Sequence, residues 1–495
     1  MQTKCAWIKN KYTSIFVSFL KVSALSSNPS WGRGRLPPVA DTPNIRPSVH
    51  HHRSRDIALV MMLGFLAALA TVQAWAENTP LNGAAPRPFY AVAHNTNTLE
   101  EAELALQHGA NALEPDFMVL PSGSHLAHPP FTSNPTGIVV YHDPYLATPR
   151  PPLTLDQYLD GLHKLAITYP HLALIVFDIK SSAALAENGP KILDSVHSHL
   201  NFDGVQVNVI LSVAERSDGA LFDNILDQLG PREGVMIDEE NDVNTTNQFF
   251  FDRGYFGNIG YGDGSVGPGF HLPRAIDLAA FNRASKGFPK AVTYVYVLNS
   301  SKSEHSFINR GVDGIIPDAF FDPMSHDFDP SYIDDLLAVV SQHPEIRLAI
   351  RDDNPFQPAN EAYGLEIVTS DVYAAGTDSE LTFTLNGSRG QATITVNTGE
   401  IHLGYYSGRM ERGNTDHVTL PSADLGLLTS ITIHNEGGVS DGWHLASIRV
   451  SSARYIGSNT NHNAEYVASC NDWINAGDSR TLTLTNVKFK TELPE

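Results

Sequence analysis

Cysteine is nearly absent from this chain, since only Cys5 and Cys470 occur in 495 residues. A scaffold held by several disulfides is therefore excluded. Cys470 has no cysteine or histidine partner at the spacing of zinc ligands, so a zinc site there is excluded as well. A single thiol of this kind is more often buried than catalytic.

Positive charge is also scarce, with 33 Lys and Arg against 54 Asp and Glu, a formal net charge of -21. Residues 1–76 hold nine basic and two acidic residues, so the rest of the chain has 24 against 52, a balance of -28. A field of this sign repels nucleic acid and anionic membrane surfaces. The composition therefore disfavours a nucleic-acid-binding protein.

Long apolar runs are missing except near the N-terminus, at residues 57–72. His50 to Arg53 and Arg55 precede this run, and Ala74-Trp75-Ala76 follows it. A basic segment, an apolar core and a small-x-small triplet are typical of a signal peptide, so we expect cleavage after Ala76 and a secreted protein. The alternative is a membrane anchor, but the core is shorter than the roughly 20 residues that span a bilayer. Residues 1–56 show no periodicity and are either a disordered extension or an unused upstream start.

Two pairs of charged residues stand at the ends of apolar stretches: Glu114 with Asp116, and Asp178 with Lys180. Residues two apart on a strand point to the same side, so each pair can direct both side chains to one point. One histidine, His94, precedes the first pair, and another, His142, lies between the pairs. Three carboxylates, two imidazoles and an ammonium that converge predict a metal-assisted phosphodiester site. The alternative, solvated loop flanks, is disfavoured because strand ends rarely collect so many charges without a ligand.

Strand-like and helix-like segments alternate from residue 89 to about residue 320. Amphipathic helices are expected at 99–108, 155–165 and 192–200, and strands at 90–93, 112–119, 138–141, 172–178, 205–212, 235–238, 292–298 and 314–316. About eight such repeats predict an α/β protein with a closed (β/α)8 TIM barrel. The chemistry of such a barrel lies at the C-terminal strand ends, where the six residues fall.

The composition changes after Pro358, and residues 364–486 are rich in Thr, Ser, Gly and alternating apolar residues. Short alternating strands with turn residues between them predict an all-β sandwich. The expected domains are thus an N-terminal extension and signal peptide (1–76), the barrel (77–360) and the sandwich (361–495).

Several motifs carry a family resemblance: the run from Ala93 to Thr98, the run from Gly109 to Asp116, Tyr141-His142-Asp143 and Phe177-Asp178-Ile179-Lys180. Together they resemble the glycerophosphodiester phosphodiesterase superfamily. The His-Arg-Gly of ordinary members is absent, and the chain is more similar to the sphingomyelinase D and phospholipase D toxin branch. The tail from Leu348 to Phe356 resembles that branch's Asp-Asn-Pro-Trp motif, which closes the barrel bottom, with Phe356 in place of the tryptophan.

The resemblance implies an enzyme that cleaves the headgroup side of sphingomyelin or lysophospholipids. It assigns one Mg²⁺ to Glu114, Asp116 and Asp178, acid and base roles to His94 and His142, and a phosphate contact to Lys180. Attack by the substrate's own hydroxyl would give a cyclic phosphate, although a covalent role for the first histidine stays open.

Substrate choice is less well defined by the resemblance. Tyr296 stands where the branch has a tryptophan, and its ring could bind a quaternary ammonium. Asp238 and Asp318 are either polar contacts at the barrel mouth or solvated loop residues. The alternatives for the whole protein are a glycerophosphodiester phosphodiesterase that acts on deacylated lipids and a noncatalytic lipid-binding protein.

The C-terminal segment resembles a PLAT (lipoxygenase-homology) domain. The matching residues are Thr369-Ser370-Asp371, Ala375-Gly376-Thr377-Asp378, Gly426-Leu427-Leu428, Ile433-His434-Asn435, the run from Trp443 to Val450, and Cys470-Asn471-Asp472-Trp473. This resemblance implies peripheral contact with a lipid surface or a partner protein, and a possible Ca²⁺ near Asp378. For Asp378 a turn-forming role is favoured over calcium binding, and Trp443 is expected in the core.

Overall fold

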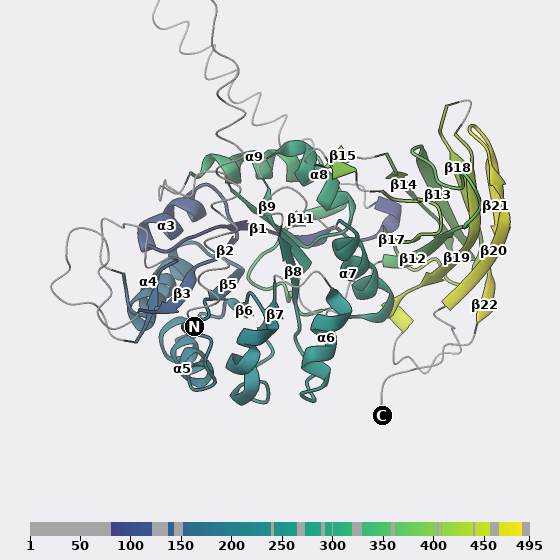
Figure 1. The fold of residues 1–495 in the computed structure, drawn as a ribbon. Helices are drawn as coiled ribbons and strands as arrows, with labels where there is room; N and C mark the ends of the chain where they lie inside the picture. The colour runs from purple at the N-terminus through teal and green to yellow at the C-terminus, as the bar shows by residue number, and fades with distance from the viewer. Residues whose placement is uncertain are drawn as a thin grey trace, which may run out of the picture. The chain divides into compact units, whose positions relative to one another are not determined.

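The computed structural model describes most of the chain after residue 80 (Figure 1). Its described residues are 81–120, 137–142, 152–238, 242–264, 273–288, 293–298, 300–318, 329–357, 362–399, 401–402, 405–406, 408–438, 441–455 and 465–487. The expected signal peptide and the cleavage after Ala76 lie outside these residues. Glu77–Glu495 forms one compact unit. None of the described helices is long and apolar enough to cross a membrane.

The N-terminal part of this unit alternates parallel strands with helices. Its barrel strands are β1 (Arg87–Ala93), β2 (Ala112–Leu113), β3 (Asp116–Val119), β5 (Leu174–Ile179), β6 (Asn208–Val213), β7 (Glu233–Ile237), β8 (Tyr261–Gly264), β9 (Thr293–Leu298) and β10 (Gly314–Pro317). The helical segments are α3 (Leu99–Gln107), α4 (Leu155–Thr168), α5 (Asn188–Ser195), η2 (Val196–Leu200), η3 (Arg216–Asn224), α6 (Val243–Phe251), α7 (Pro273–Lys286), α8 (Ser301–Asn309) and α9 (Ser331–Val340).

The strand ladders do not close into the complete ring that the sequence predicted. From β2 they run through β1, β10, β9 and β8 on one side and through β5, β6 and β7 on the other. Between β7 and β8 the described chain forms one isolated parallel bridge, Val235 to Ile259, in place of a ladder. The physical reason lies in β8, which reads Tyr-Gly-Asp-Gly, because glycine weakens a strand.

The predicted strand at 138–141 has a different role from the expected one. It forms β4 (Ile138–Val140), which pairs antiparallel with β3 and is not one of the parallel barrel strands. The barrel strand that the sequence analysis missed is β8. The predicted strand at 112–119 is divided into β2 and β3 at Pro115, which has no N–H for a ladder. Both halves pair with β5.

Side-chain alternation on the strands separates two apolar regions. On β5, Leu174 and Val176 face the barrel interior, whereas Ile175 and Phe177 pack beneath the helices. Helices α3 and α4 begin with capping boxes, in which Thr98 pairs with Glu101 and Thr154 with Gln157. These caps satisfy backbone N–H groups where each helix starts.

A tail segment fills the lower end of the barrel, as the family resemblance predicted. Strand β11 (Ile346–Leu348) pairs with the start of β1, and Phe356 joins the interior cluster with Tyr90, Ile210 and Met236. A Cβ on Gly234 would lie 2.4 Å from Cε1 of Phe356, so this position requires glycine. Phe356 therefore packs into the barrel interior at this end.

The C-terminal part of the unit is all-β, which confirms the predicted sandwich. One sheet has the order β17 (Thr415–Pro421), β12 (Ala362–Thr369), β19 (Trp443–Ser451), β20 (Glu465–Ile474) and β22 (Thr485–Val487). The other has the order β14 (Gly390–Asn397), β13 (Glu380–Gly387), β18 (Leu428–Asn435) and β21 (Ser479–Thr483), and a small hairpin joins β15 (Ile401–His402) to β16 (Tyr405–Tyr406). Trp443 lies in the core, as predicted, and its indole N–H donates to Thr369 Oγ1 at 3.0 Å.

Candidate active site

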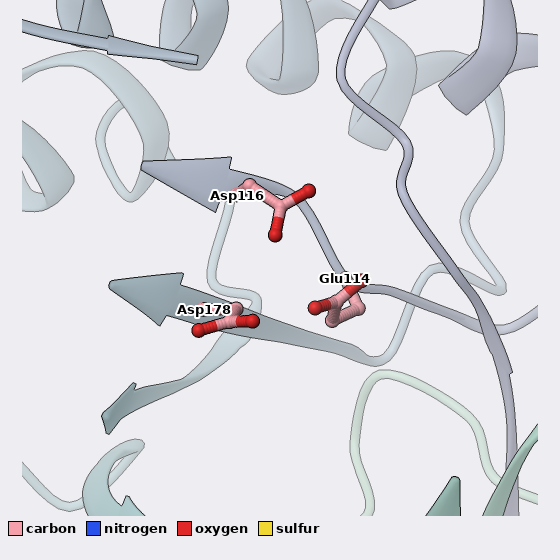
Figure 2. Close-up of side chains that lie close together, drawn as sticks. All are labelled: Glu114, Asp116 and Asp178. Atoms are coloured by element: carbon pink, nitrogen blue, oxygen red, sulfur yellow. The ribbon is translucent and has the colours of Figure 1, made fainter. Parts of the chain in front are cut away.

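Three carboxylates converge where β2 and β5 end and β3 begins (Figure 2). Glu114 follows β2, Asp116 opens β3, and Asp178 lies near the end of β5 directly opposite Asp116 in the ladder. One carboxylate oxygen from each of the three lies within 4.8 Å of the others. Among the described residues, this is the one group of three or more metal-ligating side chains.

Crowding of these carboxylates shifts their protonation. Burial, followed by the charges of Asp116 and Asp178, raises the pKa of Glu114 well above its ordinary value. Burial also opposes ionisation of Asp116, but the charges of Lys180 and His142 outweigh it and lower the pKa of Asp116 overall. Opposite pKa shifts of two adjacent buried carboxylates are typical of a functional site.

Lys180 lies inside this cluster. Its Nζ is 2.7 Å from Asp116 Oδ1 and 2.5 Å from Asp178 Oδ2. Burial opposes the charge of this ammonium, but Asp116, Asp178 and Glu114 raise the pKa of Lys180 well above its usual value. Lys180 thus shares the inward face with Asp178, as the i, i+2 spacing predicts.

The donor set fits a small divalent cation. All three groups offer carboxylate oxygens, which Mg²⁺ and Ca²⁺ prefer. Asp178 Oδ1 is buried and has no hydrogen-bond partner among the described residues, so it offers a free ligand atom. Glu114, Asp116 and Asp178 could therefore hold one metal ion.

Two asparagines that the sequence analysis missed fix the carboxylates. Asn97 donates from Nδ2 to Asp116 Oδ2 at 2.7 Å, and its Oδ1 accepts from the Asp116 backbone N–H at 2.8 Å. The backbone N–H of Asn95 donates to Glu114 Oε2 at 2.9 Å, with Asn95 in the left-handed region at φ 51°. The available signal was the Asn-x-Asn sequence directly after His94, because asparagine tolerates this conformation better than most residues.

His94 follows β1, and its Nδ1 pairs with a carboxylate oxygen of Asp318, the residue after β10. The sequence analysis left Asp318 as either a mouth contact or a solvated loop residue. Its contact with His94 places it at the mouth.

His142 follows β4, the strand that pairs antiparallel with β3. The N–H of Tyr141 donates to the carbonyl of Asp116 at 3.0 Å, which brings His142 next to the site. The residue keeps some solvent exposure. Partial desolvation of the imidazole lowers the pKa of His142, with Asp116 acting in the opposite direction and Lys180 and His94 lowering it further.

The remaining predicted contacts are less fully defined. Tyr296 lies on β9 in register with the inward-facing Ile316, but its side chain is outside the described part of the chain. Asp238 follows β7 and is buried, with its backbone N–H donating to the Val213 carbonyl at 3.1 Å. Together with the residues above, the arrangement offers a cation site, two imidazoles and an ammonium, which suits an anionic ester.

Comparison with known proteins assigns families to both parts of the chain. The profile of the dermonecrotic toxin SPH family matches residues 84–356, which is more than half of the 495 residues. The PLAT/LH2 domain profile matches residues 363–487. The N-terminal match contains all the site residues described above, and the C-terminal match coincides with the all-β part.

Individual relatives match only parts of the chain. Lipoxygenase homology domain-containing protein 1 of Mus musculus is 36% identical over 92 residues, which cover 18% of this chain and 4% of that protein. A Silicibacter pomeroyi protein described as a glycerophosphoryl diester phosphodiesterase is 14% identical, over 56% of this chain and 99% of its own, with a TM-score of 0.34. Coral 8R-lipoxygenase is 22% identical, over 25% of this chain and 17% of its own, with a TM-score of 0.20.

Proposed function

The chain belongs to the dermonecrotic toxin SPH family, and from this we propose that it is a secreted, metal-dependent phospholipase D of the sphingomyelinase D type. Family membership supports a phospholipid phosphodiesterase, and members of the family are typically secreted. The observation that carries the proposal is the convergence of Glu114, Asp116 and Asp178 beside Lys180 within the family-matched region.

The proposed cofactor is one Mg²⁺ held by Glu114, Asp116 and Asp178. A divalent cation there would neutralise charge that develops on the phosphodiester oxygens. Lys180 is proposed to contact a phosphate oxygen, since its ammonium already lies against two of the three carboxylates. Its position beside the proposed ligands would bring a bound phosphate within reach of both charges.

The two imidazoles are proposed to move protons. One takes the proton of the attacking hydroxyl and the other protonates the leaving alcohol, for which histidine is suited because its ordinary pKa is near neutral. We propose that the attacking hydroxyl belongs to the substrate itself, so that a sphingomyelin or lysophospholipid gives a cyclic phosphate and a free headgroup alcohol. Tyr296 is proposed to contact that headgroup.

The PLAT-like part is proposed to hold the protein at a lipid surface. The loop after β12 exposes Val372 and Tyr373, the latter with 88% of its surface accessible, and Trp473 on β20 is also exposed. Exposed rings of this kind suit the boundary between water and lipid. Calcium at Asp378 is not part of the proposal, because Asp441 Oδ2 accepts from Thr377 Oγ1 at 3.0 Å and from the Asp378 N–H at 3.2 Å, as in a structural turn.

The test is to incubate purified protein with sphingomyelin, lysophosphatidylcholine and glycerophosphocholine, with and without Mg²⁺, and to identify the products by phosphorus NMR. We expect a cyclic phosphate from the first two substrates, dependent on Mg²⁺ and lost in His142→Ala. His171→Ala is the matched control, because His171 contacts the Leu106 carbonyl away from the site. Turnover of glycerophosphocholine alone would support a glycerophosphodiesterase, and no turnover of any substrate would support a noncatalytic protein.

A further inference from the structure

Strand register places Asp318 directly opposite His94. In the parallel pair of β1 and β10, Tyr90 is opposite Gly314 and Ala91 is opposite Ile315. Continuing that register beyond both strand ends brings His94 opposite Asp318. Val92 and Ile316, two residues earlier on each strand, both face the barrel interior. The two side chains therefore project to the same inward side at the barrel mouth.

The contact between them involves a specific atom of the imidazole. His94 Nδ1 meets Asp318 Oδ2, and both side chains are partly exposed. The Asp318 backbone is held in turn, because its N–H donates to the Leu298 carbonyl of β9 at 3.0 Å. The Asn95 amide also lies 3.3 Å from the same Nδ1. The contact with Asp318 is the shorter one, and an Nδ1 that donates to a carboxylate cannot also accept from an amide N–H, so Asp318 is the hydrogen-bond partner of the ring.

A carboxylate at Nδ1 determines which nitrogen can accept a proton. A carboxylate accepts hydrogen bonds and cannot donate them, so a neutral imidazole beside it carries its proton on Nδ1. Nε2 is then unprotonated and faces away from Asp318. When Nε2 takes up a proton, the carboxylate also stabilises the resulting imidazolium.

We propose that Asp318 is a positioning residue that makes His94 the proton acceptor of the reaction. The proposal rests on the proposed function above. In the step, the substrate hydroxyl gives its proton to His94 Nε2 while its oxygen forms the new bond to phosphorus. The bond from phosphorus to the headgroup oxygen breaks, and that oxygen receives a proton from the imidazolium of His142. The products are a cyclic phosphate and the headgroup alcohol.

The charges that face the His94 imidazole come from several elements. Asp318 follows β10, His142 follows β4, and Glu114 is linked to the same turn through the Asn95 N–H. Asp318 is the carboxylate in contact with the ring itself. Its removal should therefore affect His94 more directly than a change at the other charges.

Three variants separate orientation from charge. Asp318→Asn can turn its amide N–H toward Nδ1 and force the proton onto Nε2, so we expect kcat/KM to fall by about 10³- to 10⁴-fold. Asp318→Ala removes the support without forcing the wrong tautomer, and we expect a loss of about 10- to 100-fold, as for other orienting partners. Asp318→Glu should restore part of the activity that alanine loses. In Asp318→Ala the acid limb of the kcat/KM profile should move to lower pH, because the imidazolium has lost its counter-charge.

The matched control uses the same chemistry at another histidine. Asp334 Oδ1 lies 3.0 Å from His108 Nδ1 on exposed surface, so Asp334→Asn removes an equivalent carboxylate away from the site. We expect it to leave kcat/KM and the pH profile unchanged.

Nitrogen-15 NMR of histidine-labelled full-length protein provides a readout that does not depend on turnover. With His94 assigned by His94→Gln, the wild-type spectrum should show the neutral form protonated at Nδ1, and this preference should be lost in Asp318→Ala. A wild-type His94 protonated at Nε2 would overturn the proposal, as would an unchanged pH profile in both Asp318→Ala and Asp318→Asn. If the variants do not fold, the tautomer of His94 in the wild-type protein still tests the proposal. An Nδ1-protonated His94 in a protein without lipid turnover would contradict the proposed function and leave this tautomer assignment standing.

Discussion

The plug at the lower end of the barrel gives a quantitative prediction for Phe356→Ala. Phe356 is only 4% exposed and lies among apolar interior residues. A phenylalanine of this kind buries about 150–250 Å², which at about 25 cal/mol/Å² amounts to about 4–6 kcal/mol. Alanine keeps the Cβ, so the expected loss in free energy of unfolding is about 3–5 kcal/mol, the usual range for such a truncation.

Gly234 allows the contact to be isolated by a double-mutant cycle. A Cβ at this position would lie 2.4 Å from Phe356 Cε1 and 2.8 Å from the Asn258 carbonyl oxygen. Gly234→Ala should therefore be destabilising by about 1–3 kcal/mol in the wild-type background. In the Phe356→Ala background, Gly234→Ala should reduce the free energy of unfolding by less, because the overlap with the ring is gone and only the overlap with Asn258 persists. The two changes should thus be coupled and not additive.

The assay is chemical denaturation followed by circular dichroism, with kcat measured below the transition. Phe256→Ala is the matched control, because Phe256 is 42% exposed and stacks on Phe251 with ring centroids 4.9 Å apart. We expect the control to lose far less stability than Phe356→Ala, and kcat to change little because the plug is at the end of the barrel opposite the site. A loss no larger than that of the control, or an additive cycle, would refute the assignment of Phe356 as the plug.

Three further predictions concern the site and the surface. Asp178→Asn should abolish Mg²⁺ binding measured by isothermal titration calorimetry. It should leave the thermal midpoint of the metal-free protein largely unchanged or raised, because it removes one of three crowded charges. Retained Mg²⁺ binding would contradict the ligand assignment. Burial raises the pKa of Asp263 to about 7, so the folded state binds more protons than the unfolded chain between about pH 4 and 7. The free energy of unfolding should therefore fall as pH rises across that window. Asp263→Asn should flatten this dependence of stability on pH in denaturation measurements. Tyr373→Ser with Trp473→Ser should weaken sedimentation with zwitterionic vesicles but leave turnover of dispersed lysolipid unchanged, and equal loss of both would argue against a surface role for these rings.

The spacing of charged residues in the sequence predicted the cluster well because it depends on local geometry. Asp178 and Lys180 lie on one strand face by alternation alone, and β2 and β3 both pair with β5, which brings Glu114 and Asp116 to the same place. The route of His142 could not be predicted in this way. Its strand looks like any short apolar strand, and only the antiparallel pairing with β3 shows that it returns to Asp116.

Features that depend on pairing between distant segments were the ones that the sequence left open. Asp318 meets His94 because β10 neighbours β1, although the two residues are 224 positions apart. Strand β8 was missed because Tyr261 and Asp263 alternate with glycines and give no apolar run. That weak strand also lies at the junction where the expected closed ring is spanned by a single bridge.

The tail that plugs the barrel also has a consequence for the order in which the chain can fold. Asn111 Nδ2 donates to the Ala349 carbonyl, 238 residues later, and Asn208 Nδ2 donates to the Asp353 carbonyl, 145 residues later. These amides lie in the first half of the barrel, and their hydrogen-bond acceptors belong to its last segment. Early strands made on the ribosome therefore cannot reach their final state before residue 356 has been synthesised. Contacts of such long range slow folding, because the chain must close large loops before they form. A nascent chain of this protein thus stays incompletely folded until its tail arrives, a state in which chaperones can still engage it.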